Sequence, residues 1–244
     1  GGSWTSLNPG FATVTNAGLV QGVSAGTAGL IFTLTSTGCT SVDTIFIAVN
    51  ARPVVSIIGL NPICVGNTTT MLPNSGGTWA STNNAIATIT NGGIVTGVSQ
   101  GTARFIFTSA TTGCASAPSA VLTVQPKPVA VITGINPICV GNTTTLSPSS
   151  GGTWASNNPT VATINNGGVV TGLSTGTAEF TFTETATQCM SVASAPVTVN
   201  AAPVVGVTGS QLICAGFTTT LSPSSGGVWI SNHPNIAVVN ASGV

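Results

Sequence analysis

The 244 residues include three Lys or Arg, three Asp or Glu and one His, so charged side chains make up 2% of the chain and the formal net charge is zero. Soluble domains carry about 25% charged residues, and a chain this neutral lacks the basic surface needed to bind nucleic acid or an anionic membrane. Apolar residues at 42% exclude a disordered chain despite 31 Gly and 14 Pro, and no apolar run approaches the roughly 18 residues of a membrane span.

A repeat organises the whole sequence. The four Trp residues, both series of Cys and the prolines of the linkers all recur at a step of 75 residues, and self-similarity at a fixed period indicates a tandem array. The chain begins and ends inside a unit, so we expect it to be a fragment of a longer polypeptide. The predicted units are the C-terminal part of one repeat over residues 1–51, complete repeats over 52–126 and 127–201, and the N-terminal part of another over 202–244.

Taken in chain order, the repeat at 52–126 is predicted to form about seven short strands. Thr and Val favour strands, Gly, Asn and Pro interrupt them, and turn signals at this spacing are typical of an immunoglobulin-like (Ig-like) sandwich. No helical periodicity is present. We therefore predict an all-β fold of tandem Ig-like β-sandwich domains, arranged as a rod by stiff proline linkers. The expected strands are Val54–Gly59, Thr68–Leu72, Gly77–Ser81, Ala85–Thr90, Ile94–Val98, Thr102–Thr108 and a last strand ending at Val121–Val124.

The sixth of these strands has the clearest alternation. Every second residue is apolar in all three copies, whereas Gly29, Arg104 and Glu179 lie between them at equivalent positions and vary in charge. Alternation with period two predicts one buried and one solvent-facing side. The inward positions are Ala28, Leu30, Phe32, Ala103, Phe105, Phe107, Ala178, Phe180 and Phe182.

Each repeat carries one Trp, at the third expected strand of the unit. A large aromatic there can fill the space between two sheets. The alternative is an exposed ring that stacks on a sugar, and the core role is favoured. The residues are Trp4, Trp79, Trp154 and Trp229.

Six periodic cysteines indicate disulfides and therefore an extracellular location. No two cysteines have CxxC spacing and the single histidine is His233, which excludes a zinc site. The cysteines are Cys39, Cys64, Cys114, Cys139, Cys189 and Cys214.

The pairing of these cysteines has two competing interpretations. Pairs within one repeat are favoured because they make each unit self-sufficient. Counting strands, however, puts Cys64 and Cys114 at opposite poles of a simple sandwich, beyond the roughly 7 Å that a disulfide allows. The pair Cys64–Cys189, which joins one repeat to the next, therefore stays open. The favoured pairs are Cys64–Cys114 and Cys139–Cys189, with Cys39 and Cys214 left for partners outside the chain.

No set of catalytic residues can be assembled. His233, Glu179 and Glu184 each differ from the residues at equivalent positions of other repeats, so solvated surface charges are favoured over a glycosidase pair. The linkers contain no Asp or Glu, which argues against Ca²⁺ sites. We expect no enzymatic activity, no cofactor and no metal.

Three short motifs follow one another in each repeat, and their order resembles the bacterial immunoglobulin-like repeat, group 2. That family has tryptophan–serine–asparagine–proline, followed by VATV, GxVTG and GTA. The resemblance covers nearly the whole chain and implies a structural scaffold without naming a ligand. The matching segments are Trp154–Thr163, Gly168–Gly172 and Gly176–Ala178, with copies at Trp4–Val14, Gly18–Gly22, Gly26–Ala28, Trp79–Thr88 and Gly93–Gly97.

A second motif differs from the general family pattern and resembles a smaller group of proteins. The segment Cys-Val-Gly-Asn-Thr-Thr-Thr, with a later Gly38-Cys39 or Gly113-Cys114, is similar to segments of giant secreted surface proteins of the Bacteroidota, including SprB-type gliding adhesins. The resemblance implies an adhesin or filament at the bacterial cell surface. Asp43-Thr44-Ile45 resembles the short O-glycosylation acceptor of Bacteroidota secreted proteins, which makes Thr44 a candidate site.

Two functional classes remain. The first is a stalk or filament that projects an adhesive tip or transmits force, with self-association into filaments and with surface polysaccharide or other cells bound through parts outside this chain. The second is a multivalent array whose repeats hold glycans, ice or a partner chain, for instance on the neutral runs Thr68–Thr70, Thr143–Thr145 and Thr218–Thr220. Ordinary strand propensity explains these runs equally well. The varied outward positions of the sixth strand favour the stalk.

Overall fold

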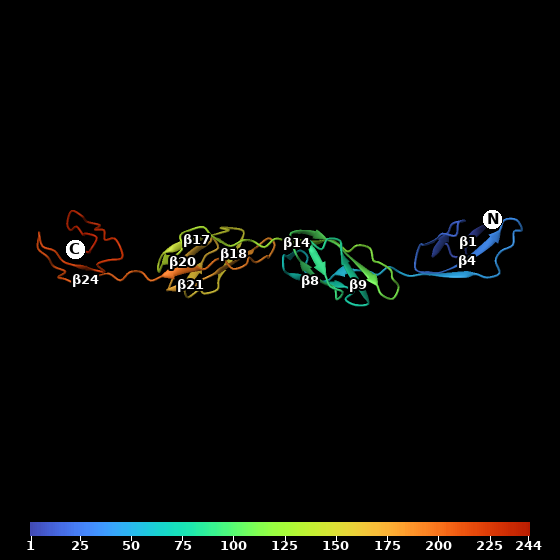
Figure 1. The fold of residues 1–244 in the computed structure, drawn as a ribbon, viewed down its shortest axis with the longest axis horizontal. Coiled ribbons are helices and arrows are strands. Elements are labelled where there is room, and N and C mark those ends of the chain that lie inside the picture. The colour runs from blue at the N-terminus through green and yellow to red at the C-terminus, as the bar shows by residue number, and fades with distance from the viewer. The chain divides into compact units, whose positions relative to one another are not determined.

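The computed structural model describes residues 1–244 as strands, turns and loops without a helix, which confirms the all-β prediction (Figure 1). Contacts divide the chain into two compact units, and each is described by itself. One unit is Gly1–Pro128 with Thr183–Ser191, and the other is Val129–Phe182 with Val192–Val244. The predicted repeat boundaries are a different division of the chain and stay predictions.

Residues 52–126 form three small sheets. Their orders are β10-β11-β8-β6, β12-β14-β7 and β13-β9. All pairs are antiparallel except β14 with β7, which are parallel. The strands are β6 (Ser56–Ile57), β7 (Ile63–Cys64), β8 (Thr68–Leu72), β9 (Gly77–Ser81), β10 (Ala87–Ile89), β11 (Ile94–Gly97), β12 (Gly101–Ala103), β13 (Phe105–Ser109) and β14 (Leu122–Gln125).

Residues 127–201 repeat this arrangement. The sheet orders are β15-β17-β20-β19, β16-β23-β21 and β18-β22, and β16 and β23 are the parallel pair. The strands are β15 (Val131–Ile132), β16 (Ile138–Cys139), β17 (Thr143–Ser147), β18 (Gly152–Ser156), β19 (Ala162–Ile164), β20 (Val169–Gly172), β21 (Gly176–Ala178), β22 (Phe180–Glu184) and β23 (Val197–Asn200).

The ends of the chain have fewer strands. Residues 1–51 contain the sheet β1-β4-β5 and the two-stranded pair β2-β3, and residues 202–244 contain only the pair β24-β25. The strands are β1 (Gly2–Ser6), β2 (Ala12–Val14), β3 (Val20–Gly22), β4 (Gly26–Leu34), β5 (Ile45–Val49), β24 (Gly206–Val207) and β25 (Leu221–Ser222).

Two separate hydrophobic cores lie at residues 55–124 and 130–199. The expected alternation of the sixth strand holds in both, because Phe105, Phe107, Phe180 and Phe182 are all at most 3% exposed. In residues 1–51 the strand β4 is less well covered, and Phe32 is only half-buried. Alternating side chains therefore build a core wherever a second sheet faces them.

The predicted strands at Ala85–Thr90 and Ile94–Val98 are slightly shorter in the structure, and three differences are larger. The strand expected at Val54–Gly59 shrinks to β6, since Val54 is 88% exposed. The strand expected at Thr102–Thr108 divides at Arg104 into β12 and β13, which pair with different partners. The strand β7 was not predicted, because two residues between Pro62 and a turn carry no periodicity.

Candidate functional site

One disulfide is present, and it joins Cys64 to Cys189 across 125 residues of sequence with a Cα–Cα distance of 5.6 Å. Cys64 is the last residue of β7 and lies opposite Gln125 of β14. Cys189 lies in the turn after β22, where its carbonyl accepts a hydrogen bond from the Glu184 N–H at 3.0 Å. The bond therefore connects the predicted repeat 52–126 to the predicted repeat 127–201.

The favoured pairs Cys64–Cys114 and Cys139–Cys189 are wrong. Pairing through Val124 of β14 puts Ile63 level with Gly101, where β12 begins, and Cys64 lies one residue farther from β13. Cys114 lies at the far end of β13, where its carbonyl accepts from the Ser109 N–H. Eight residues of extended chain separate these levels by about 25 Å, which is far beyond disulfide reach.

Four cysteines are free thiols in this structure, and they occupy the same local positions as the bonded pair. Cys139 lies opposite Asn200 in the parallel pair β16–β23, as Cys64 lies opposite Gln125. Cys39 and Cys114 follow the same turn as Cys189. Their participation in disulfides stays a prediction. The four are Cys39, Cys114, Cys139 and Cys214.

Trp79 and Trp154 are each 8% exposed and belong to the two hydrophobic cores. The Trp79 Nε1–H donates to the Pro73 carbonyl at 2.9 Å, and Trp154 donates to Pro148 at 3.0 Å. Each ring also contacts a Phe of the neighbouring strand in the same sheet, with centroids 5.2 Å apart for Trp79 and Phe107. A sugar cannot stack on rings covered in this way.

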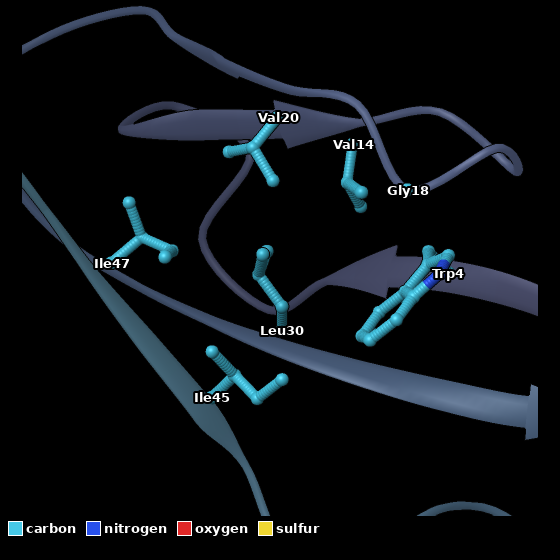
Figure 2. Close-up of a pocket in the computed structure, with 7 residues that line it drawn as sticks. All are labelled: Trp4, Val14, Gly18, Val20, Leu30, Ile45 and Ile47. Atoms are coloured by element: carbon cyan, nitrogen blue, oxygen red, sulfur yellow. The ribbon is translucent and has the colours of Figure 1, made fainter.

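Trp4 is placed differently, because it lines an open cavity of about 140 Å³ (Figure 2). The side chains of Val14, Val20, Leu30 and Ile47 point into the same space from β2, β3, β4 and β5. We call this the Trp4 cavity; Gly18 and Ile45 complete its lining. The sequence pattern did not predict it, since each lining residue on its own matches an ordinary core position.

Trp229 is half-buried, and its Nε1–H donates to the Pro223 carbonyl at 3.0 Å.

The remaining candidate residues are not brought together. His233 is exposed and contacts the neighbouring Asn232, and the Glu184 carboxylate accepts a hydrogen bond from Thr187 at 2.6 Å. No group of three or more His, Cys, Asp and Glu side chains is placed to hold a metal ion. Thr44 is half-buried directly before β5, and its glycosylation stays a prediction.

The Thr runs have a mixed environment. Thr68 and Thr143 are exposed, whereas Thr69 and Thr144 are buried at 5% and 4% exposure. The hydroxyls of these two buried residues have no hydrogen-bond partner. This alternation is what ordinary strand residues show, and binding of ice or a glycan by the outward Thr residues stays a prediction. None of the elements is a helix with the length and apolar character needed to cross a membrane.

Comparisons with solved structures find remote likenesses. The S-layer protein rSbsC(31-844) is 17% identical with a TM-score of 0.27, over 84% of this chain and 36% of that chain. A C-terminal intimin fragment in complex with the intimin-binding domain of its receptor is 15% identical with a TM-score of 0.37, over 64% and 67%. Invasin, a bacterial integrin-binding protein, is 13% identical with a TM-score of 0.37, over 88% and 55%.

This chain thus spans about a third of the S-layer structure and about half of the invasin structure. Similarity at this level carries no argument about function. No curated protein is significantly similar to the chain.

A family model gives a firmer result. The bacterial Ig-like domain, group 2, matches residues 64–118 and 120–194, which together are more than half of the chain. Ig-like domains in tandem are typical of non-enzymatic structural or binding proteins. With its two hydrophobic cores, its all-β sheets and these two matches, the chain belongs to the bacterial Ig-like domain family, group 2.

Proposed function

We propose that the chain is a stretch of the shaft of an extracellular adhesin or filament at the bacterial cell surface. The shaft holds an adhesive part away from the cell and carries force between the two. The Cys64–Cys189 disulfide is the observation that carries this proposal, because it ties one predicted repeat to the next. A binding array whose repeats act one by one has no need of such a crosslink.

The crosslink supports a force-bearing role in a specific way. Tension applied at the two ends of the chain passes from Cys64 through the sulfur atoms to Cys189. The 124 residues between them are removed from the load path. Those residues include both buried tryptophans and most of both hydrophobic cores. Tension therefore cannot stretch the segment between the two cysteines while the disulfide is intact.

Single-molecule stretching of the chain tests the proposal. With the disulfide intact, unfolding releases only the residues outside the crosslinked segment. With dithiothreitol, or in the Cys64→Ser variant, the fully stretched chain is expected to be longer by about 400 Å, at roughly 3.3–3.6 Å per residue. A contour length that is the same under both conditions contradicts a load-shielding disulfide.

The arrangement of repeats as a rod is part of the proposal. Short linkers containing Pro53, Pro128 and Pro203 restrict φ and resist collapse. Domains of about 30–40 Å placed in line give a particle longer than about 100 Å. Small-angle scattering from the oxidised chain is expected to show this length, and the dimensions of a compact globule would contradict it.

The finer assignment is a giant Bacteroidota surface adhesin, related to the SprB-type gliding adhesins. It is supported by the variant Cys-Val-Gly-Asn-Thr-Thr-Thr motif, and it extends the proposal to secretion and gliding motility. Surface polysaccharide or other cells are the proposed partners of regions outside this chain. Electron microscopy of source cells labelled with an antibody to the chain is expected to show surface filaments. Label confined to the cell interior contradicts this assignment.

A further inference from the structure

Asparagine is followed by glycine at two places in the sequence, Asn91–Gly92 and Asn166–Gly167, and the two places are equivalent positions of the repeat. Each pair lies in the tight turn between two antiparallel strands, β10 and β11 in one case and β19 and β20 in the other. Both asparagines and both glycines are exposed. The two turns are therefore built alike and are open to water.

The backbone of a nearby strand holds the asparagine side chain of each turn. The Trp79 N–H donates to Asn91 Oδ1 at 3.2 Å, and the Trp154 N–H donates to Asn166 Oδ1 at 3.4 Å. A donor at this oxygen stabilises the negative charge that the oxygen gains when a nucleophile attacks the amide carbon. The hydrogen bond therefore activates the side-chain carbon, Cγ, toward nucleophiles.

The other groups that take part in a reaction at Cγ are free. The N–H groups of Gly92 and Gly167, the next residues along the backbone, donate no hydrogen bond, and the Nδ2 group of each asparagine donates none either. Because glycine has no Cβ, its nitrogen is the least hindered of backbone nitrogens. Each turn thus combines an unhindered nucleophile, an activated carbon and an unbound leaving group.

We propose that Asn91 and Asn166 are sites of spontaneous deamidation, which the fold promotes. The Gly92 nitrogen attacks Asn91 Cγ and gives its proton to the solvent, the bond from Cγ to Nδ2 breaks, and ammonia leaves. The product is a five-membered succinimide ring, formed by an intramolecular step between neighbouring residues. One water molecule then opens the ring at either of its carbonyl carbons, and the result is aspartate or isoaspartate.

The two products have different effects on the fold. Aspartate at position 91 keeps an oxygen atom that accepts from the Trp79 N–H. Isoaspartate routes the backbone through the former side chain, so its carboxylate is attached at Cα and the bond from Trp79 is lost. The strand β9 pairs only with β13, and the Trp79 N–H then becomes an unpaired donor at an open edge of the sheet.

Deamidation also changes the charge of the chain. The sequence has three cations and three anions, so conversion at both turns takes the formal net charge from zero to −2. Copies of a protein without net charge associate more readily than copies that repel one another. Deamidation therefore makes the protein more anionic and less prone to association as it ages. The inference does not depend on the proposed shaft, and its failure leaves the stretching experiment unaffected.

Peptide mass spectrometry of the oxidised chain during incubation at neutral pH tests the proposal. We expect conversion of Asn91 and Asn166 to both products, since isoaspartate forms only through the succinimide. The rates are expected to exceed those of the same chain unfolded in urea by roughly 2–10-fold, less than the roughly 10²–10³ of an enclosed oxyanion donor. Asn16 holds the equivalent position in residues 1–51, but Ala17 follows it and no bond joins it to Trp4, so Asn16 is expected to stay unconverted.

Gly92→Ala is the matched variant. A Cβ at Gly92 comes no closer than 3.7 Å to the Thr90 hydroxyl, so the turn and the bond from Trp79 to Asn91 are expected to remain, and equal thermal unfolding checks this. The added methyl group hinders the attacking nitrogen and is expected to slow conversion of Asn91 about tenfold, with the rate at Asn166 unchanged. Conversion that is slower in the folded chain than in urea, or equal at Asn91 with and without the substitution, overturns the proposal.

Discussion

Cys64 lies opposite Gln125 in the parallel pair β7–β14, and this pairing decides where the disulfide can go. It holds Cys64 at the end of residues 52–126 where the chain continues into the next linker. The Asn61 side chain fixes the pairing, because its Nδ2–H donates to the Val121 carbonyl at 2.8 Å and its Oδ1 accepts from the Thr123 N–H at 3.1 Å. Asn136 repeats both bonds with Pro196 and Thr198.

The first prediction concerns the disulfide itself. Non-reducing proteolysis of the chain is expected to yield one peptide pair that contains Cys64 and Cys189, and reduction is expected to lower the free energy of unfolding by about 2–4 kcal/mol. The physical reason is that the crosslink restricts the unfolded chain over 125 residues. Mass spectrometry and denaturant unfolding with and without dithiothreitol are the measurements. A Cys64–Cys114 peptide contradicts the pairing.

Asn61→Asp tests the bridge that holds β7 beside β14. The carboxylate still accepts from the Thr123 N–H but cannot donate to the Val121 carbonyl, so two oxygen atoms face each other. We expect a loss of about 1 kcal/mol in the free energy of unfolding. Asn91→Asp is the matched control, because the Asn91 side chain only accepts a bond, from the Trp79 N–H at 3.2 Å. Equal effects of the two substitutions on urea unfolding contradict the role of the Asn61 amide.

Trp79→Ala removes the largest side chain of the core at residues 55–124. Truncating a buried Trp is expected to cost about 3–5 kcal/mol, through lost burial and the cavity that remains. Trp79→Phe keeps an aromatic ring beside Phe107 and loses the bond to Pro73, so its cost is expected to be smaller. The intact Trp154 reports on the other core by fluorescence. If both cores of Trp79→Ala unfold in one transition, with no earlier unfolding of residues 55–124, then the two cores are not independent.

The sequence predicts the local part of this structure and misses the non-local part. Strands at Thr68–Leu72 and Gly77–Ser81 were predicted with the observed bounds, because turn residues and alternating side chains define them locally. The strand β7 pairs with a strand 61 residues away, and its two residues are too few to show an alternating pattern in the sequence. Without that strand the sequence does not show at which end of the domain Cys64 lies, and therefore does not show which cysteine it can reach.

The turn at Asn91–Gly93 gives the last prediction, with two adjacent glycines as test and control. Gly93 has a φ of +75°, and a Cβ added there would collide with the Met71 carbonyl oxygen. Gly92 has an ordinary φ, and its Cβ would come no closer than 3.7 Å to the Thr90 hydroxyl. Gly93→Ala therefore introduces left-handed backbone strain of about 1–2 kcal/mol. It also displaces β8, which weakens the hydrogen bond from the Met71 N–H to the Gly93 carbonyl.

We expect Gly93→Ala to lower the free energy of unfolding by at least 2 kcal/mol, roughly the strain plus part of one buried hydrogen bond. Gly92→Ala is expected to change it by less than about 0.5 kcal/mol, as for an unstrained surface substitution. Urea unfolding followed by tryptophan fluorescence measures both, in chains where Trp4, Trp154 and Trp229 are replaced by Phe so that Trp79 is the reporter. If the two variants unfold at the same urea concentration, then the close approach of β8 to this turn does not contribute to stability, and β8 packs against the turn less closely than the structure indicates.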